Sequence, residues 1–75
     1  MISAVKIQDL KRGEKAMVAA LVGNEAEIAR LSAMGIRGGA SIEILRRGST
    51  CIVQVDQSRI CLRPQRHTQI LVRPA

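Results

Sequence analysis

The alternation of apolar and polar residues predicts a chain made mostly of short β-strands. An apolar run over residues 16–22 indicates a strand buried on both faces. In a second strand, over residues 40–46, Ile42 and Ile44 alternate with polar neighbours. A last strand is predicted over residues 69–72, after a polar connection. With the two hairpin strands described next, this makes five strands, which are enough to curl into a small barrel.

Two tight turns are predicted to join the middle three strands into an antiparallel meander. We expect the first turn to be centred on Arg47 and Gly48, and the second on Gln57 and Ser58. A slip by one residue would move every apolar side chain to the other face of the sheet. The expected turns instead place apolar residues opposite one another, in the pairs Ile44 with Cys51, Ile42 with Val53, Val55 with Ile60, and Val53 with Leu62.

One α-helix is predicted over residues 25–34. Asn24 is a good N-cap, and Glu27 stands at the third helical position, where a capping-box carboxylate can reach back to the N-cap. The apolar positions of the helix fall on one arc, which we expect to face the core. They are Ile28, Leu31 and Met34.

A glycine directly after the last patterned residue predicts the end of this helix. Gly35 can adopt the left-handed conformation of a helix C-terminus without the steric cost of a Cβ atom. Ile36 then lies where it can contact Leu31 across the last turn, as in a Schellman closure. Residues 38–39, both glycine, provide the next reversal into the following strand.

The N-terminal segment is predicted to form a single helical turn. Ile7 and Leu10 stand at helical spacing, and Gly13 follows them. We expect this turn to pack over an open end of the barrel, with the longer helix acting as a plug or lid.

Length and composition limit the possible functions. A chain of 75 residues is one domain, residues 1–75, and it contains no Phe, Trp or Tyr, so its core is built from aliphatic side chains. No apolar run reaches the roughly 18 residues of a membrane span, and the N-terminus lacks the features of a signal peptide. We therefore expect a cytoplasmic protein.

The charge balance suggests an acidic partner. Twelve Lys and Arg against six Asp and Glu give a formal net charge of +6, although a basic surface that only keeps the protein soluble is an equally good interpretation. A small basic nucleic-acid-binding or repressor-associated barrel is one alternative, but without aromatic rings to stack on bases we expect no stable nucleic-acid complex. The cations that would contact phosphates are Arg46, Arg47, Arg59, Arg63 and Arg66.

A metal site is a further alternative. Cys51 is expected to face the core, and Cys61 the opposite, outward face, so a disulfide between them is disfavoured. Cys61 and His67 could together bind a transition metal weakly, but two ligands make an incomplete site. No nucleophile with an orienting base is present, and the glycines follow a helix instead of preceding one, so we expect no enzyme and no bound cofactor.

The residues that define this architecture resemble the ferrous iron transport protein A (FeoA) family. The most specific segment is R-L-x-x-M-G-I-x-x-G over residues 30–39, followed by Leu62-Arg63 and a closing I-x-V. The resemblance covers essentially the whole chain. It implies a mainly β, SH3-like barrel without enzymatic activity, acting as a cytosolic accessory component of bacterial ferrous iron uptake.

The resemblance also implies a partner, the cytoplasmic G-protein region of the ferrous iron permease FeoB. In this interpretation the protein is peripheral to the membrane only through that permease, and is a monomer or a weak homo-oligomer. We expect the partner to contact the end of the helix and the loop after it, at Arg30, Met34, Gly35, Ile36, Arg37 and Gly39. Structural roles are expected for Asn24, Glu27, Leu31, Gly48, Leu62 and Arg63.

Overall fold

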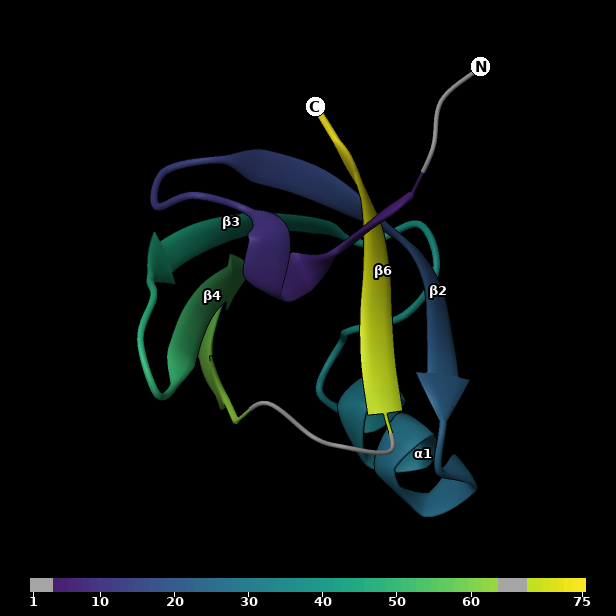
Figure 1. The fold of residues 1–75 in the computed structure, drawn as a ribbon. Coiled ribbons are helices and arrows are strands. Elements are labelled where there is room, and N and C mark those ends of the chain that lie inside the picture. Colours follow the sequence, from purple (N-terminus) through teal and green to yellow (C-terminus); the bar gives the residue numbers. More distant parts are fainter. Residues whose placement is uncertain (1–3, 64–67) are drawn as a thin grey trace.

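The computed structural model describes residues 4–63 and 68–75 as six antiparallel strands, one α-helix and a 3-10 turn (Figure 1). The mainly β fold with one helix and an N-terminal helical turn is as predicted. In chain order the elements are β1 (Val5–Lys6), the 3-10 turn η1 (Ile7–Asp9), β2 (Lys15–Gly23), α1 (Glu25–Ala33), β3 (Ser41–Arg46), β4 (Cys51–Val55), β5 (Ser58–Leu62) and β6 (Thr68–Pro74).

The strands form one curved sheet in the order β1-β6-β2-β3-β4-β5. Five of them correspond to the predicted strands, and the sixth is the two-residue β1, in which Val5 lies opposite Val72 of β6. Such a short strand has no apolar alternation of its own, so the pattern of the sequence did not reveal it. The predicted meander of β3, β4 and β5 is present.

The long strand β2 holds the two halves of the sheet together. Its first residues pair with β3, and nearly its whole length pairs with β6, from Ala16 opposite Pro74 to Gly23 opposite Thr68. A register shift between Val18 and Ala20 interrupts this ladder. Such irregularities bend a strand and increase its twist, which helps the sheet to curl.

One face of β2 is open to solvent, so the prediction of a strand buried on both faces is wrong. Ala16 and Val18 are buried, but Met17 and Val22 are 47% and 54% exposed. The sheet is antiparallel, and antiparallel sheets commonly pack one face on the core while the other meets water.

Both hairpin registers differ from the prediction by two residues. Ile44 lies opposite Val53, because the first connection spans residues 47–50 and a register shift precedes it. Val53 in turn lies opposite Ile60. Side chains alternate with a period of two, so a shift by two residues changes the partners but leaves the paired apolar side chains on their predicted face.

The core is aliphatic throughout. Fourteen buried hydrophobic residues from all the strands except β1, and from α1, η1 and the loops, form one cluster. Its largest fully buried side chains are Ile36, Ile44, Val18, Val53 and Val72. Ile7 and Leu10 belong to the same cluster, so the predicted N-terminal turn does pack on the barrel.

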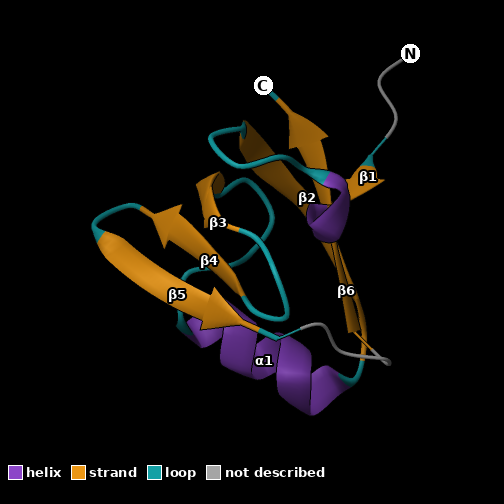
Figure 2. Cartoon of the chain, turned by 60° about the vertical axis from the view of Figure 1, so that its left-hand side comes forward, coloured by secondary structure: helices purple, strands orange, loops and turns teal. Residues whose placement is uncertain are grey.

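Both ends of α1 are closed as predicted. The Asn24 side chain accepts a hydrogen bond from the backbone N–H of Glu27 at 3.0 Å. At the other end the N–H of Ile36 donates to the carbonyl of Leu31 at 2.9 Å, and Gly35 N–H donates to Ser32 at 3.0 Å. This is the Schellman pattern, and Gly35 has the positive φ, +99°, that it requires. Figure 2 shows the helix lying across the end of the barrel beneath β4 and β5.

Candidate partner-binding site

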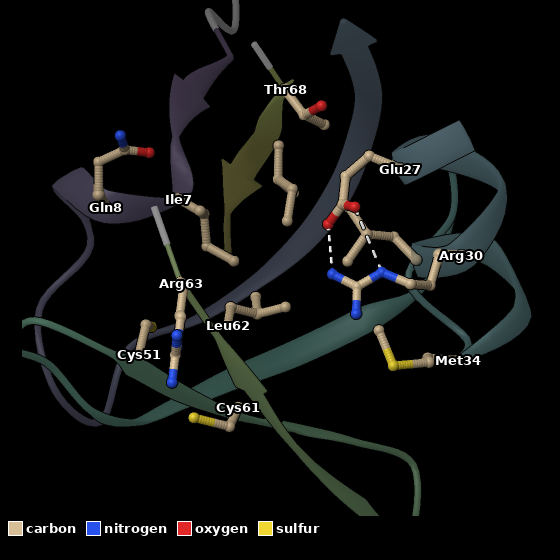
Figure 3. Close-up of a pocket in the computed structure, with 12 residues that line it drawn as sticks. Ile7, Gln8, Glu27, Arg30, Met34, Cys51, Cys61, Leu62, Arg63 and Thr68 are labelled. Carbon is tan, nitrogen blue, oxygen red and sulfur yellow. Dashed lines mark hydrogen bonds and ion pairs between the residues drawn. The ribbon is translucent and has the colours of Figure 1, made fainter. Parts of the chain in front are cut away.

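A cavity of about 530 Å³ opens between β5, β6, η1 and α1 (Figure 3). Most of its wall is apolar, and its charged groups come from the helix and from the end of β5. The lining residues are Ile7, Gln8, Glu27, Arg30, Leu31, Met34, Cys51, Cys61, Leu62, Arg63, Thr68 and Ile70.

The cavity exists because the sheet does not close at this point. β5 is the last strand in the sheet order and, among the strands of residues 4–63 and 68–75, pairs only with β4. On the other side, β1 pairs only with Val72 and Leu71, so the first residues of β6 pair with β2 alone. The side chains of Thr68 and Ile70 in this part of β6 line the cavity.

The C-terminal half of α1 forms one wall of this cavity. Leu31 is buried against the core, whereas Met34 is 37% exposed at the rim. The prediction that Met34 faces the core is therefore wrong, because the helix ends over the open part of the barrel. An unbranched thioether side chain in this position can adapt to differently shaped apolar partners.

Arg30 and Glu27 form an ion pair on the same wall (Figure 3). The Arg30 guanidinium donates two hydrogen bonds to the Glu27 carboxylate, one of them from Nε to Oε2 at 3.2 Å. The pair raises the pKa of Arg30. Among the described contacts the Glu27 carboxylate binds Arg30 and not the N-cap backbone, so the reciprocal half of the predicted capping box is replaced by this ion pair.

Two thiols lie on the β5 side of the cavity, on different faces of the sheet. Cys51 is half-buried opposite Leu62, and Cys61 is exposed opposite Ile52, which separates them as predicted. Burial raises the pKa of the Cys51 thiol, and the nearby Arg47 guanidinium opposes this effect. Both cysteines are free.

The loop after α1 is held firmly against β2. Gly39 N–H donates to the carbonyl of Val18 at 2.8 Å, and Val18 N–H donates to Ala40 at 2.8 Å. Arg37 is exposed on this loop, and its role in partner binding stays a prediction. Ile36 is 0% exposed, so the prediction that its side chain contacts a partner is wrong: it is the apolar clamp of the helix end and part of the core.

The remaining structural predictions refer to Leu62, Arg63 and Gly48. Leu62 is buried and Arg63 is exposed beside it, both at the cavity. Gly48 adopts a φ of +151° in the connection between β3 and β4. Gly48 is thus a turn residue, but in a longer loop than predicted.

The proposed metal ligands are tested only in part. Cys61 is exposed at the cavity, but His67 lies outside the described residues. Within residues 4–63 and 68–75, no three His, Cys, Asp or Glu side chains are grouped as a metal site needs. Weak metal binding by Cys61 and His67 stays a prediction.

Several residues of the cavity had no signal in the sequence. Ile7, Ile70 and Thr68 are far apart in the chain, and each is typical of an ordinary strand or turn. Only the curvature of the sheet brings them together. The sequence predicted the wall over residues 30–34 because Gly35 marks the end of the helix there. The opposite wall, formed by η1 and β6, has no comparable sequence feature.

Comparisons with known proteins agree with this architecture. A family model, the FeoA domain, matches residues 5–74. A crystal structure described as an iron uptake regulatory protein (FeoA), solved by sulfur SAD in a monoclinic space group, superposes with a TM-score of 0.85. The alignment covers 97% of this chain and 100% of that one at 23% sequence identity, which shows a shared fold. A search of curated proteins found no match.

Proposed function

The chain belongs to the FeoA family, and from this premise we propose that it acts in ferrous iron uptake by docking on the cytoplasmic G-protein region of the iron permease FeoB. Members of this family are small accessory domains of iron transport and not known enzymes. In the described part of the chain no helix has the length and apolar character needed to span a bilayer. Contact with the permease, in this proposal, is made at its cytoplasmic face.

The observation that carries the proposal is the open, mainly apolar cavity beside α1. Its floor includes Leu31 and Ile70, and Met34 stands exposed at its rim. Pockets with apolar walls and a few polar groups at the edge are typical binding sites. We propose that apolar side chains of the permease fill this cavity.

The rigid loop after the helix supports the same surface. Hydrogen bonds to Val18 and the Schellman closure at Gly35 hold the backbone that presents Arg37. The ion pair with Glu27 similarly orients Arg30. Groups that are already ordered before binding lose little conformational entropy when the complex forms.

Calorimetric titration with the purified cytoplasmic domain of the permease tests this proposal. We expect Met34→Ala to weaken binding by about 10-fold or more, because it removes a rim side chain that would pack against the inserted apolar groups, and truncating a central interface residue typically costs more than ~1 kcal/mol. Met17→Ala is the matched control, since Met17 is 47% exposed on the other face of the sheet, away from the cavity. We expect it to bind like the unmodified protein.

A charge reversal tests the loop separately. Arg37→Glu is expected to weaken the same complex, with Lys6→Glu as the control because Lys6 lies on β1. If the unmodified protein does not bind, or if Met34→Ala and Arg37→Glu both bind as tightly as their controls, the proposed surface is incorrect.

A further inference from the structure

Arginines surround an apolar centre on the outer face of β3, β4 and β5. Arg46 lies opposite Ile52, and Ile52 lies opposite Cys61, so the three residues form one row across the strands. Arg59 lies two residues before Cys61 in β5, which places it next to this row on the same face. Arg63 directly follows the end of β5, two residues after Cys61. All three arginines are exposed, and Ile52 is half-buried. We call these five residues the basic face.

The turn before β2 adds further positive charge beside this face. Gly13 N–H donates to the carbonyl of Ile44 at 2.7 Å, which brings the preceding Lys11 and Arg12 to the end of β3. Arg47, next to Arg46, donates a hydrogen bond from its guanidinium to the carbonyl of Gln8 at 3.1 Å. Positive side chains from two separate segments therefore lie near one end of the basic face.

Carboxylates offset only part of this charge. Glu43 occupies the outer face of β3, opposite Lys15 of β2 on one side and Gln54 of β4 on the other, and Gln54 in turn lies opposite Arg59. The Glu14 carboxylate accepts the backbone N–H of Lys11 at 2.6 Å, and Asp9 is exposed in η1. Asp56 is exposed in the turn between β4 and β5. The five residues of the basic face itself include three arginines and no carboxylate, so the face keeps an excess of cations.

We infer that the basic face binds the surface of an anionic phospholipid membrane. Arginine matches the geometry of phosphate groups, and each cation held near an anionic membrane surface contributes about 1 kcal/mol. Ile52 supplies an apolar contact at the centre of the arginines. This inference goes beyond the proposed function, because it concerns a face formed by the sheet and not the cavity itself.

The composition favours a membrane over nucleic acid as the partner. Proteins that bind single strands usually stack bases on aromatic rings, and this chain contains none. An aliphatic side chain such as Ile52 has no equivalent partner on a phosphate backbone, whereas it can contact lipid near the headgroups. Arg63 belongs both to this face and to the cavity rim, so the membrane and the proposed docking site would lie next to each other.

Co-sedimentation with lipid vesicles tests the inference on the protein alone. We expect binding to vesicles in which about a third of the phosphatidylcholine is replaced by phosphatidylglycerol, and little binding to pure phosphatidylcholine. Binding should weaken as salt is added, because added ions screen surface charges. The double variant Arg46→Glu/Arg59→Glu should bind at least about 30-fold more weakly, the equivalent of losing two such contacts.

A second double variant separates the location of the charge from its amount. Lys6→Glu/Arg73→Glu lowers the net charge equally, but its positions lie on β1 and β6, away from the basic face. We expect it to keep most of the vesicle binding. Circular dichroism of both variants verifies that they fold.

Three outcomes would overturn the inference. The first is no binding to anionic vesicles at low salt, and the second is an equal loss in both folded double variants, which would indicate a general charge effect. The third is that the protein binds duplex DNA or RNA more strongly than vesicles at the same salt concentration, and that the Arg46→Glu/Arg59→Glu variant loses this nucleic-acid binding. Because no permease is present, none of these results bears on the proposed docking in the cavity.

Discussion

The two sides of the sheet differ in how completely their strands are paired. On one side, β6 lies between β1 and β2 and pairs with β2 along nearly its whole length. On the other side, β5 pairs with β4 alone among the described strands, and the cavity opens next to it. We call these the closed side and the open side.

The difference indicates that the two sides of this small protein have different roles, one in stability and the other in binding. The closed side buries Val18 and Val72 almost completely, so its side chains contribute mainly to stability. The open side leaves Met34 and Cys61 accessible around the cavity. We expect substitutions on the closed side to lower stability, and substitutions on the open side to affect binding first.

The largest expected effect is at Val72 on the closed side. Val72 is 0% exposed, and Val72→Ala should lower the free energy of unfolding by about 2 kcal/mol, from lost burial and the cavity left behind. Val22→Ala is the matched control: it makes the same chemical change on the neighbouring strand, at a residue that is 54% exposed. It should change the free energy of unfolding by less than about 0.5 kcal/mol. Urea denaturation measures both, and equal effects would contradict the comparison.

A smaller effect is expected at the helix end on the open side. Gly35→Ala should cost about 1 kcal/mol, because an alanine at a φ of +99° is strained. The added Cβ would meet Val55 Cγ1 at 3.5 Å, an ordinary contact, so the cost comes from the backbone.

Gly38→Ala is the matched control for this change. Its Cβ would meet the Ala19 carbonyl oxygen at 3.8 Å, also an ordinary contact, and Gly38 does not have a positive φ. We expect Gly38→Ala to be neutral or slightly stabilising in thermal denaturation, since it reduces the freedom of the unfolded chain. A Gly35→Ala variant as stable as Gly38→Ala would show that the Schellman closure contributes little.

The two thiols of the open side are expected to differ in reactivity. Iodoacetamide should label Cys61 several-fold faster than Cys51, because Cys61 is exposed, whereas burial both shields Cys51 and raises its pKa. The raised pKa means that Cys51 reaches its full labelling rate at a higher pH than an ordinary cysteine does. Mass spectrometry of Cys51→Ser and Cys61→Ser variants across pH resolves the two rates, and equal rates would show that the open side admits reagent to both.

The smallest effect on stability is expected at the rim of the cavity. Met34→Ala should change the free energy of unfolding by less than about 0.5 kcal/mol, because Met34 is 37% exposed. Chemical denaturation of this variant sharpens the comparison, since the same substitution is the one expected to weaken partner binding. A loss of stability comparable to that of Val72→Ala would place Met34 in the core after all.

Local signals in the sequence predicted most of the fold. Asn24 and Gly35 marked the ends of the helix, and both make the expected hydrogen bonds or backbone turn. In the hairpins, the faces of the apolar side chains were predicted correctly, but the residues opposite them were not. The alternation of apolar residues determines which face a side chain lies on, but it does not distinguish registers that differ by two residues. The second turn is formed by Asp56 and Gln57, where Asp56 has a φ of +53°, a conformation that aspartate tolerates.

The candidate site could be predicted only on its helical wall. Arg30 and Met34 were selected because they stand beside the helix-ending glycine, and both line the cavity. Thr68 and Ile70 were not, since they lie near α1 and β5 only once the sheet has curled. The curvature of the sheet is a property of the whole fold, which no local pattern encodes.

The position of β6 has a consequence for how the protein folds. Its two neighbours, β1 and β2, come from the first third of the chain, while β6 itself comes from the last residues. Contacts between distant segments require closing a long loop and slow the search for the native state. We expect the β3-β4-β5 meander to form early and β6 to insert last, so a nascent chain in which β6 has not yet left the ribosome would hold an unfinished barrel.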